Sequence, residues 1–409
     1  MNGFSTRALH TALARKDAHG TLRMPVYDNV AFEFETSQDL QLAFEGRRPG
    51  HSYSRISNPT VEDFENRVRL VSGATAIVAV SSGMAAISSV VLALAESGTN
   101  IVASRFLFGN TVSLFEHTLG PWGLEVRYAD FSRPDELDQV IDERTRALFV
   151  ETITNPQLQV VDLRRVAEIA HKRGVPVIVD STVTALYLFR SRDFGVDVEV
   201  ISSTKCISGG ATSVGGLILD NGLFDWKQNP RLESWGRKFG PHALALRLRR
   251  EVYRNLGTCL SPHNAFLQSL GLETVELRVD RSCASALALA RHLEAHPRIR
   301  RVNYPGLPSS PWHETARAQF PRGFGGILCF ELGSRSECFA FMDRLKVIRR
   351  ATNINDNKTL VIHPASTIFC EYSPEERERM GVTDTLVRLS VGIEEIGDLI
   401  DDIQNGLQS

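Results

Sequence analysis

Alternating strand and helix patterns, running from about residue 60 to about residue 255, restrict the fold of this chain more than any other feature. Residues 148–150 and 175–179 have the short apolar pattern of buried strands, and residues 163–172 between them have the period of an amphipathic helix that stops at Gly174. Strands separated by helices pair in parallel, because each crossover returns the chain to the same end of the sheet. The sequence therefore predicts an α/β domain with a mostly parallel sheet.

The segments on either side have different patterns. Residues 1–58 contain few periodic stretches and several Gly, Pro and Asn breaks. An apolar-periodic stretch at 265–292 and strand candidates at 326–332 and 386–391 predict a smaller α+β domain. We expect an N-terminal arm at 1–58, a ligand-binding α/β domain at 59–255 and a C-terminal domain at 256–409.

Composition excludes several classes of protein. With 409 residues, 43% hydrophobic residues and a net charge of −2, the chain can bury a large core and lacks the basic surplus of nucleic-acid-binding or membrane-surface proteins. No apolar run approaches the about 20 residues that span a bilayer, and Met1-Asn-Gly-Phe4 has no secretory apolar region, so we expect a cytoplasmic protein. Six cysteines without CxxC spacing argue against a zinc site or a disulfide framework, so we expect no bound metal.

A lysine and an aspartate each follow a predicted strand. Val198-Glu-Val-Ile-Ser-Ser-Thr-Lys205 is a β-branched run that ends in hydroxyls and Lys205, and Val175-Pro-Val-Ile-Val-Asp180 ends in a carboxylate. Open α/β sheets bind ligands at this edge. A lysine that forms an imine and an aspartate that keeps a pyridine nitrogen protonated together suit pyridoxal 5′-phosphate. Taken singly, Lys205 is more typical of a surface lysine, and Asp180 is equally typical of a helix N-cap.

A strand-turn-helix at residues 76–94 offers a phosphate site. Ala76-Ile-Val-Ala-Val80 breaks into Ser81-Ser-Gly-Met-Ala-Ala86 and continues as an apolar helix. Gly83 allows close backbone approach, and a helix N-terminus has unpaired N–H groups that attract an anion. The Gly-Lys-Ser/Thr of nucleoside triphosphate loops is absent, so a monophosphate fits better, although a purely structural turn has the same pattern.

Together with Tyr53-Ser-Arg-Ile-Ser-Asn-Pro-Thr60, these segments resemble the Cys/Met-metabolism family of pyridoxal-phosphate enzymes over nearly the whole chain. The resemblance continues, in order, through Glu151-Thr-Ile-Thr-Asn-Pro156, Ser261-Pro-His-Asn-Ala-Phe-Leu267, Gly271-Leu-Glu-Thr274, Tyr304-Pro-Gly-Leu307, His363-Pro-Ala-Ser366 and Arg388-Leu-Ser-Val-Gly392. It implies the fold type I, or aspartate-aminotransferase-like, architecture.

The resemblance also implies roles for individual residues. Lys205 is the Schiff-base lysine and the general acid/base, Asp180 faces the pyridine nitrogen, Asn155 lies near the 3′-oxygen, and Phe108 stacks on the ring. The phosphate is held by Ser82, Gly83, Met84, Ser202 and Thr204, and the substrate carboxylate by Arg388 and Asn353. For Arg388 a salt bridge to a structural carboxylate is the alternative, for Asn155 a plain Asn-Pro turn.

The family's N-terminal arm implies an oligomer. By resemblance, Tyr53 and Arg55 reach the phosphate of a neighbouring subunit, Tyr53 with a catalytic role, in a tetramer built from two dimers that share active sites. A guanidinium suits that dianion because its fork binds two oxygens at once. A surface loop is the alternative for this segment.

Several positions depart from the family pattern. Phe108 replaces a ring-stacking tyrosine, and Asn110 stands where γ-lyases often have cysteine. Ser181 replaces an asparagine, Gly210 and Thr212 lie where Gly-His-x-Asp is common, and Asn353 takes the place of a serine. The lost phenol weakens any mechanism in which this tyrosine moves a proton, and leaves Lys205 or Tyr53 for that task.

Lys358-Thr-Leu-Val-Ile-His-Pro-Ala-Ser366 and Ser373-Pro-Glu-Glu376 are most similar to O-acetylhomoserine sulfhydrylases. We therefore expect γ-replacement on an O-acylhomoserine, with homocysteine as product in methionine biosynthesis. Methionine γ-lyase and cystathionine γ-synthase share every cofactor residue and stay open, as does a non-catalytic cofactor-binding protein. The sulfur source is open as well: free sulfide, a thiol, or a thiocarboxylate on a sulfur-carrier protein.

Overall fold

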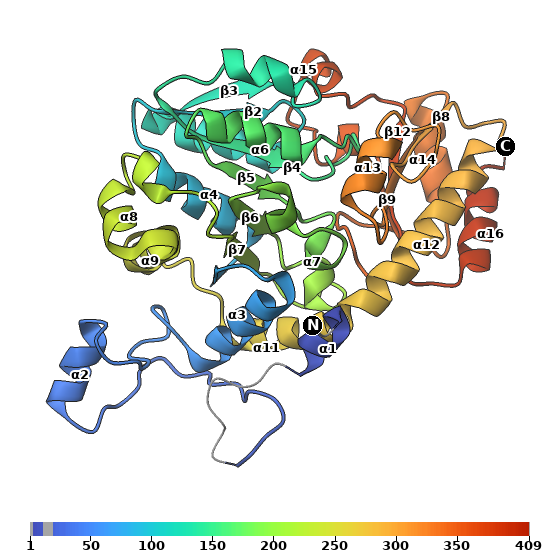
Figure 1. The fold of residues 1–409 in the computed structure, drawn as a ribbon. Helices are drawn as coiled ribbons and strands as arrows, with labels where there is room; N and C mark the ends of the chain where they lie inside the picture. The colour runs from blue at the N-terminus through green and yellow to red at the C-terminus, as the bar shows by residue number, and fades with distance from the viewer. Residues whose placement is uncertain (1–2, 11–18, 409) are drawn as a thin grey trace.

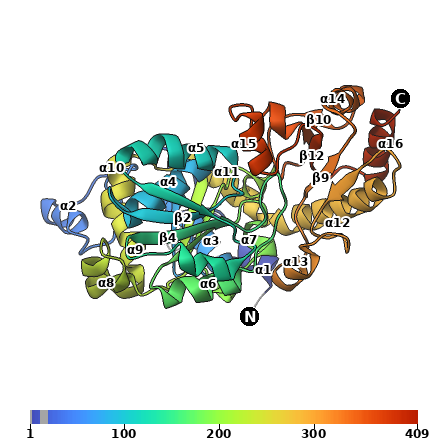
Figure 2. The same ribbon diagram turned by 90° about the horizontal axis from the view of Figure 1, so that it is seen from above.

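The computed structural model describes residues 3–10 and 19–408. Met1, Asn2 and Ser409 lie outside the described residues, as does the part of the predicted arm at 11–18. The chain forms a larger unit around a seven-stranded sheet and a smaller unit around a five-stranded sheet. Figures 1 and 2 show the two units side by side, with the long helix α12 (Val275–Glu294) running along the smaller one.

The larger sheet has the order β1-β7-β6-β5-β4-β2-β3. Its strands are β1 (Ala76–Val80), β2 (Asn100–Ser104), β3 (Glu125–Ala129), β4 (Thr145–Glu151), β5 (Val177–Asp180), β6 (Val198–Ile201) and β7 (Gly216–Asp220). Strands β3, β2, β4, β5 and β6 are parallel, whereas β7 is antiparallel to both of its neighbours. The predicted mostly parallel α/β sheet is confirmed.

Helices cover both faces of this sheet because its strands are apolar on both faces. Along β5, Ile178 packs into one core together with α4 (Gly83–Leu94), while Val177 and Val179 pack into another together with α6 (Leu163–Lys172). The remaining helices of this unit are α3 (Pro59–Ser72), α5 (Gly109–Ser113), α7 (Ala185–Leu188), α8 (Glu233–Phe239), α9 (Ala243–Arg247), α10 (Arg254–Leu256) and α11 (Pro262–Glu273). Helix α6 has the predicted bounds, with Asp162 capping its N-terminus and Gly174, at φ 66°, following its end.

The smaller sheet has the order β10-β11-β12-β9-β8. It consists of β8 (Arg301–Asn303), β9 (Ile327–Glu331), β10 (Arg349–Arg350), β11 (Leu360–Ile362) and β12 (Leu386–Ser390), and is accompanied by α12, α13 (His313–Gln319), α14 (Arg335–Arg344), α15 (Pro374–Arg379) and α16 (Ile396–Gly406). Both strand candidates of the sequence, β9 and β12, are central in it. Their neighbourhood matters for the site because β12 carries Arg388.

Helix α11 belongs to the core of the larger unit, although its residues fall inside the predicted C-terminal domain. Leu260, Ala265 and Leu272 are buried in one cluster with residues of α3, β1 and β7. Gly271 permits the contact, because a Cβ at this position would lie 2.2 Å from the carbonyl oxygen of Ile207. The domain boundaries at 58 and 255 stay a prediction.

The described part of the N-terminal segment contains α1 (Phe4–Leu9) and α2 (Ser37–Phe44). Helix α1 packs on the larger unit through Phe4 and Ala8. Helix α2 buries none of its residues, and Figure 1 shows it projecting away from the rest of the chain. No helix among the described residues is long and apolar enough to cross a membrane.

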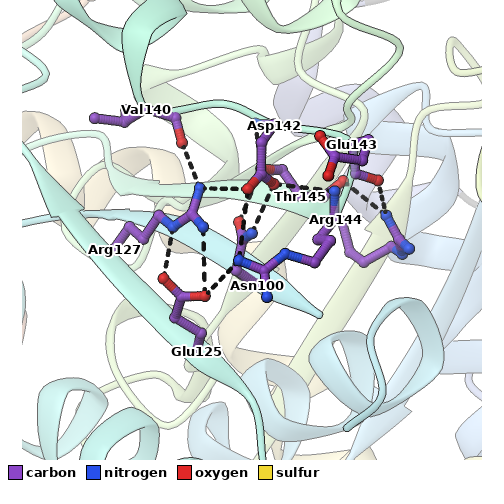
Figure 3. Close-up of polar contacts among 9 residues, drawn as sticks. Asn100, Glu125, Arg127, Val140, Asp142, Glu143, Arg144 and Thr145 are labelled. Atoms are coloured by element: carbon purple, nitrogen blue, oxygen red, sulfur yellow. Dashed lines mark hydrogen bonds and ion pairs between the residues drawn. The ribbon is translucent and has the colours of Figure 1, made fainter. Parts of the chain in front are cut away.

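Polar contacts fasten the N-terminal ends of three neighbouring strands (Figure 3). Arg127 on β3 pairs with Glu125 at 2.7 Å and with Asp142 at 2.8 Å, and Asp142 also accepts a hydrogen bond from Asn100 of β2 at 2.8 Å. The side-chain hydroxyl of Thr145, the first residue of β4, donates to Asn100. This network holds the strand ends that lie opposite the site described next.

Candidate active site

A cavity of about 310 Å³ lies at the C-terminal ends of the parallel strands, where they face the smaller sheet. It brings together most of the predicted site residues from both units. Its lining includes Ser82, Gly83, Met84, Phe108, Glu151, Asn155, Asp180, Ser202, Thr204, Lys205, Asn353 and Arg388. The lysine, the aspartate and the arginine therefore share one enclosed site although they are up to about 200 positions apart in the sequence.

Lys205 follows β6 after a short connection, and its side chain enters the cavity. Its ammonium group donates to the side-chain oxygen of Asn353 at 2.7 Å. Burial and the positive charge of Arg388 lower the pKa of Lys205, while Asp356 acts in the opposite direction. A lower pKa increases the fraction of neutral amine, which is the form that can attack a carbonyl carbon or accept a proton.

Two carboxylates stand next to each other on neighbouring strands. Asp180 at the end of β5 is in register with Glu151 at the end of β4. Asp180 accepts a hydrogen bond from the backbone N–H of Thr182 at 2.8 Å, yet burial raises its pKa. Burial, together with the charge of Asp180, raises the pKa of Glu151 to about 8. A cationic ring nitrogen next to Asp180 would offset the cost of keeping that carboxylate charged.

One end of the cavity has the properties of a phosphate site. Ser82 caps α4 by accepting from Ala85, which leaves the N–H groups of Gly83 and Met84 without a hydrogen-bond partner among the described residues. A Cβ on Gly83 would lie 2.7 Å from the Cβ of Ser202, so glycine is required for the close approach. These N–H groups at the N-terminus of a twelve-residue helix fit an anion.

Arg388 forms the wall on the side of the smaller sheet. It is 3% exposed and donates to the side-chain oxygen of Asn155 and to the backbone oxygen of Asn353, both at 3.0 Å. Its Nε is buried without a partner among the described residues, and burial lowers its pKa to about 10. No carboxylate pairs with Arg388 among the described residues, so the alternative of a structural salt bridge is not formed within this chain.

Glu151 is a site residue that the sequence did not single out. Its carboxylate accepts from the backbone N–H groups of Phe108, at 2.6 Å, and Asn155, at 3.2 Å, and so fixes the two segments on either side of the cavity. It stands in a motif that the sequence did identify, Glu151-Thr-Ile-Thr-Asn-Pro156. The available signal was its place at the C-terminal end of a buried strand beside the strand of Asp180.

Tyr53 and Arg55 are not part of this cavity in their own chain. Tyr53 is 40% exposed, and the guanidinium of Arg55 lies over its ring at 5.4 Å and donates to the backbone oxygen of Arg254. Both side chains stand at the surface of the larger unit, which leaves them accessible to another subunit.

Two of the departures from the family pattern have structural partners. The hydroxyl of Ser181 donates to the buried carboxylate of Glu199, which also accepts from Ser191. Gly210 has φ 112°, and a Cβ there would lie 2.3 Å from the side-chain nitrogen of Asn357, so a side chain at this position would collide. Ser181 thus pairs with a buried carboxylate, and Gly210 allows the loop after Lys205 to pass close to Asn357.

Replacing Glu151 with glutamine should flatten the pH dependence of stability of the cofactor-free protein. In the folded state the pKa is about 8, above the ordinary value of 4.5, so the folded protein retains a proton that the unfolded chain has released. The stabilisation that this bound proton gives the folded state is complete below pH 4.5. As pH rises from 4.5 through 8 it is lost, and the free energy of unfolding falls by at most about 1.4 kcal/mol per pH unit. The free energy of unfolding of wild type and Glu151→Gln, measured in urea at pH 5.5 and 7.5, checks this.

The exposed Glu168 on α6 supplies the control, because Glu168→Gln should keep the wild-type slope. Equal slopes in wild type and Glu151→Gln would show that Glu151 is ionised throughout this range.

Comparison with known proteins identifies the family. Residues 5–408 match the model of the Cys/Met metabolism PLP-dependent enzymes. The homocysteine/cysteine synthase of Kluyveromyces lactis is 38% identical, over 98% of this chain and 96% of that protein. Two solved structures each cover 100% of both chains. The O-acetylhomoserine sulfhydrylase of Wolinella succinogenes, described in its methionine biosynthetic pathway, has a TM-score of 0.81 and 44% identity.

The second structure, from Campylobacter jejuni, has a TM-score of 0.96 and 33% identity, and contains N′-pyridoxyl-lysine-5′-monophosphate at position 205 of that protein. The residues of the present cavity fit this group: a lysine of lowered pKa, a half-buried aspartate and free N–H groups at a helix N-terminus. This chain belongs to the Cys/Met metabolism family of pyridoxal-phosphate-dependent enzymes.

Proposed function

We propose that this enzyme replaces the γ-acyloxy group of an O-acylhomoserine, most simply O-acetyl-L-homoserine, with a sulfur nucleophile, and so forms homocysteine for methionine biosynthesis. The observation that carries the proposal is the joint placement in one cavity of Lys205 and of Arg388, which has no carboxylate partner among the described residues. An amino-acid substrate needs both an amine-exchanging lysine and a carboxylate-binding arginine. The names of the relatives in Kluyveromyces lactis and Wolinella succinogenes support this choice of reaction.

The chain's own residues then perform distinct tasks. Arg388 binds the α-carboxylate, with Asn155 and Asn353 holding its guanidinium in place. Pyridoxal 5′-phosphate, when bound, supplies the electron sink for the carbanions of the reaction. Lys205 takes the proton from Cα and moves protons at Cβ as well. The Cγ–O bond breaks with release of the carboxylic acid, the Cγ–S bond forms, and the protons return to Cβ and Cα.

The departure at Phe108 restricts which groups can move protons. Phe108 lines the cavity and can stack on a ring, but it has no hydroxyl, and no tyrosine of the described residues lines the cavity. Proton transfer at the leaving group therefore falls to Lys205 or to Tyr53 of another subunit.

We propose that the active site is completed by a second copy of the chain. Tyr53 and Arg55 are displayed at the surface, and the neighbouring arm exposes Val30 and, on α2, Leu40 and Phe44, the last at 69%. Exposed apolar side chains on a projecting helix are typical of a segment that is buried in an assembly. A tetramer of two such dimers is the assembly that we propose.

All six cysteines, which lie within the described residues, are unpaired, in accordance with a cytoplasmic protein.

Subunit mixing tests the shared site. Arg55→Ala and Lys205→Ala should each be inactive alone, but a mixed dimer contains one site with both residues intact. With random exchange, half of the dimers are mixed and half of their sites are complete, so about a quarter of wild-type activity should return. Activity of the co-refolded mixture measures this. A mixture as inactive as its components would show that Arg55 does not act across subunits.

Three assays, two with a pair of substrates and one with L-methionine alone, separate the proposed reaction from its alternatives. The cofactor-loaded enzyme should convert O-acetyl-L-homoserine and sulfide to homocysteine. Release of methanethiol and 2-oxobutyrate from L-methionine, at a comparable rate, would favour a γ-lyase instead. Cystathionine from an O-acylhomoserine and cysteine would favour cystathionine γ-synthase. If none of the three assays gives a product, the enzyme uses a carrier-bound sulfur donor or the chain is a non-catalytic cofactor-binding protein.

A further inference from the structure

The loop at 353–357 connects β10 to β11 in the smaller unit and is fastened to the larger unit. Its side-chain amides donate to backbone oxygens that lie before and after Lys205 in the sequence. These bonds join Asn355 to Thr182 and Val183, both at 3.2 Å, and Asn357 to Gly209, at 2.9 Å. Ile354 is buried in the same apolar cluster as Val179 of β5. The position of the loop next to Lys205 is therefore fixed by contacts that do not involve Lys205 itself.

Within this loop the side-chain amide of Asn353 lies between an ammonium group and a carboxylate. Its Oδ1 accepts from Lys205 at 2.7 Å, and its Nδ2 donates to Oδ2 of Asp356 at 3.1 Å. The other oxygen of Asp356 accepts from the backbone N–H of Lys358 at 3.1 Å, which holds the carboxylate in place. An ionised carboxylate can only accept hydrogen bonds. Asp356 therefore selects the orientation in which the amide nitrogen faces it and the amide oxygen faces Lys205.

The orientation of this amide decides what Lys205 can do with its lone pair. A neutral amine has two N–H groups and one lone pair. An acceptor beside it takes one N–H group and leaves the lone pair free, whereas a donor in the same place would occupy the lone pair. An amide oxygen next to Lys205 thus keeps the amine available as a base.

The side chain and the backbone of Asn353 contact different groups of the cavity. Arg388 donates to the backbone oxygen of Asn353 at 3.0 Å, and the side-chain oxygen of Asn353 accepts from Lys205. A substitution of this side chain therefore removes the contact with Lys205 and leaves in place the oxygen to which Arg388 bonds.

We propose that Asn353 and Asp356 form a positioning pair for Lys205: Asp356 orients the amide of Asn353, and the amide oxygen holds one N–H of the lysine, so that its lone pair is free to take the Cα proton of a bound amino acid. The resemblance to the family places Asn353 at the substrate carboxylate, and the pair gives its side chain a different task. The proposal rests on the role given to Lys205 in the proposed function, but not on the leaving group or the sulfur nucleophile.

The pKa of Lys205 in the cofactor-free protein tests the hydrogen bond directly. Competitive acetylation with acetic anhydride at a series of pH values, read by peptide mass spectrometry, gives the pKa of this one amine. Asn353→Ala removes an acceptor from the ammonium form, so the pKa of Lys205 should fall by about one unit. The other titratable groups that line the cavity, Glu151, Asp180 and Arg388, are the same in wild type and variant.

Asp356→Asn is isosteric, but it offers a single oxygen to the two N–H groups that the carboxylate serves. It also removes a negative charge that raises the pKa of Lys205. A double variant separates the two effects. If Asp356 works through Asn353, Asp356→Asn lowers the pKa of Lys205 less in an Asn353→Ala background than in wild type. Equal effects in both backgrounds would show that Asp356 acts by its charge alone and would overturn the pair.

The control for charge removal is Asp398→Asn, which neutralises an exposed carboxylate in the first turn of α16 and should leave the pKa of Lys205 unchanged.

Exchange of the Cα hydrogen of L-norleucine in D₂O, catalysed by the cofactor-loaded enzyme and followed by NMR, tests the consequence for the base. L-Norleucine has no leaving group at Cγ, so its exchange does not require γ-replacement. Asn353→Ala should lower the exchange rate constant at saturation by at least about 10-fold, while the dissociation constant of L-norleucine, from the absorbance of the cofactor imine, stays within about 2-fold. A side chain that binds the substrate carboxylate would change the dissociation constant instead.

An unchanged pKa of Lys205 in cofactor-free Asn353→Ala would overturn the proposal. Weaker binding of L-norleucine with an unchanged exchange rate constant would overturn it as well, because Asn353 would then act on the substrate. If Asn353→Ala does not fold, the isosteric Asp356→Asn carries the test through the exchange rate constant. If wild type exchanges the Cα hydrogen and the variants lose this exchange, while no homocysteine forms, the pair is supported and only the proposed reaction fails.

Discussion

Lys205→Ala should abolish turnover, with a loss in kcat of at least about 10³-fold, and should remove the imine absorbance of the cofactor-loaded enzyme. Lys205 is the single amine that lines the catalytic cavity among the described residues, so no neighbouring lysine can substitute for it. Its contact with Asn353, at 2.7 Å, positions the amine in the cavity, and its lowered pKa increases the fraction of neutral amine.

The control for this variant is Lys172→Ala, which removes an exposed lysine at the end of α6. It should retain both the absorbance and the rate. Retention of the imine absorbance in Lys205→Ala would mean that another lysine holds the cofactor, and the assignment of the site would be wrong.

Arg388→Lys should lower kcat/KM for the amino-acid substrate by about 100-fold, mainly through a higher KM, because an ammonium group cannot replace the bidentate fork of a guanidinium. Lysine would also lose the bonds to Asn155 and Asn353 that orient Arg388. Steady-state kinetics with O-acetyl-L-homoserine and sulfide measure both constants.

A substrate analogue without the α-carboxylate separates substrate binding from a general structural effect. Wild type and Arg388→Lys should process O-acetyl-3-aminopropanol at similarly low rates, because neither can use a carboxylate that is absent. If the variant is 100-fold worse with this amine too, Arg388 supports the architecture of the site and does not bind the carboxylate.

The sequence predicted the elements around the catalytic lysine well. Helix 163–172 and the strands that end at Val80, Asp180 and Ile201 could be predicted because each is a short, strongly apolar segment with clear breaks beside it. Their convergence follows from parallel pairing, which places all of the C-terminal ends at one edge.

Long-range packing was harder to predict. Helix α11 has the same apolar pattern whether it packs on one unit or the other. Its buried cluster with α3, β1 and β7 and the close approach of Gly271 to Ile207 assign it to the larger unit. Glu151 was missed although, like Asp180, it is a carboxylate at the end of a buried strand. Its role depends on strand register and on the N–H groups of Phe108 and Asn155, which sequence periodicity does not reveal.

The most direct test of the proposed reaction is the number of homocysteine molecules formed for each acetate released from O-acetyl-L-homoserine by the cofactor-loaded enzyme at saturating sulfide. The proposed γ-replacement predicts a ratio close to one, with homocysteine absent when sulfide is withheld. Acetate release accompanied by 2-oxobutyrate, with no homocysteine even at saturating sulfide, would contradict it.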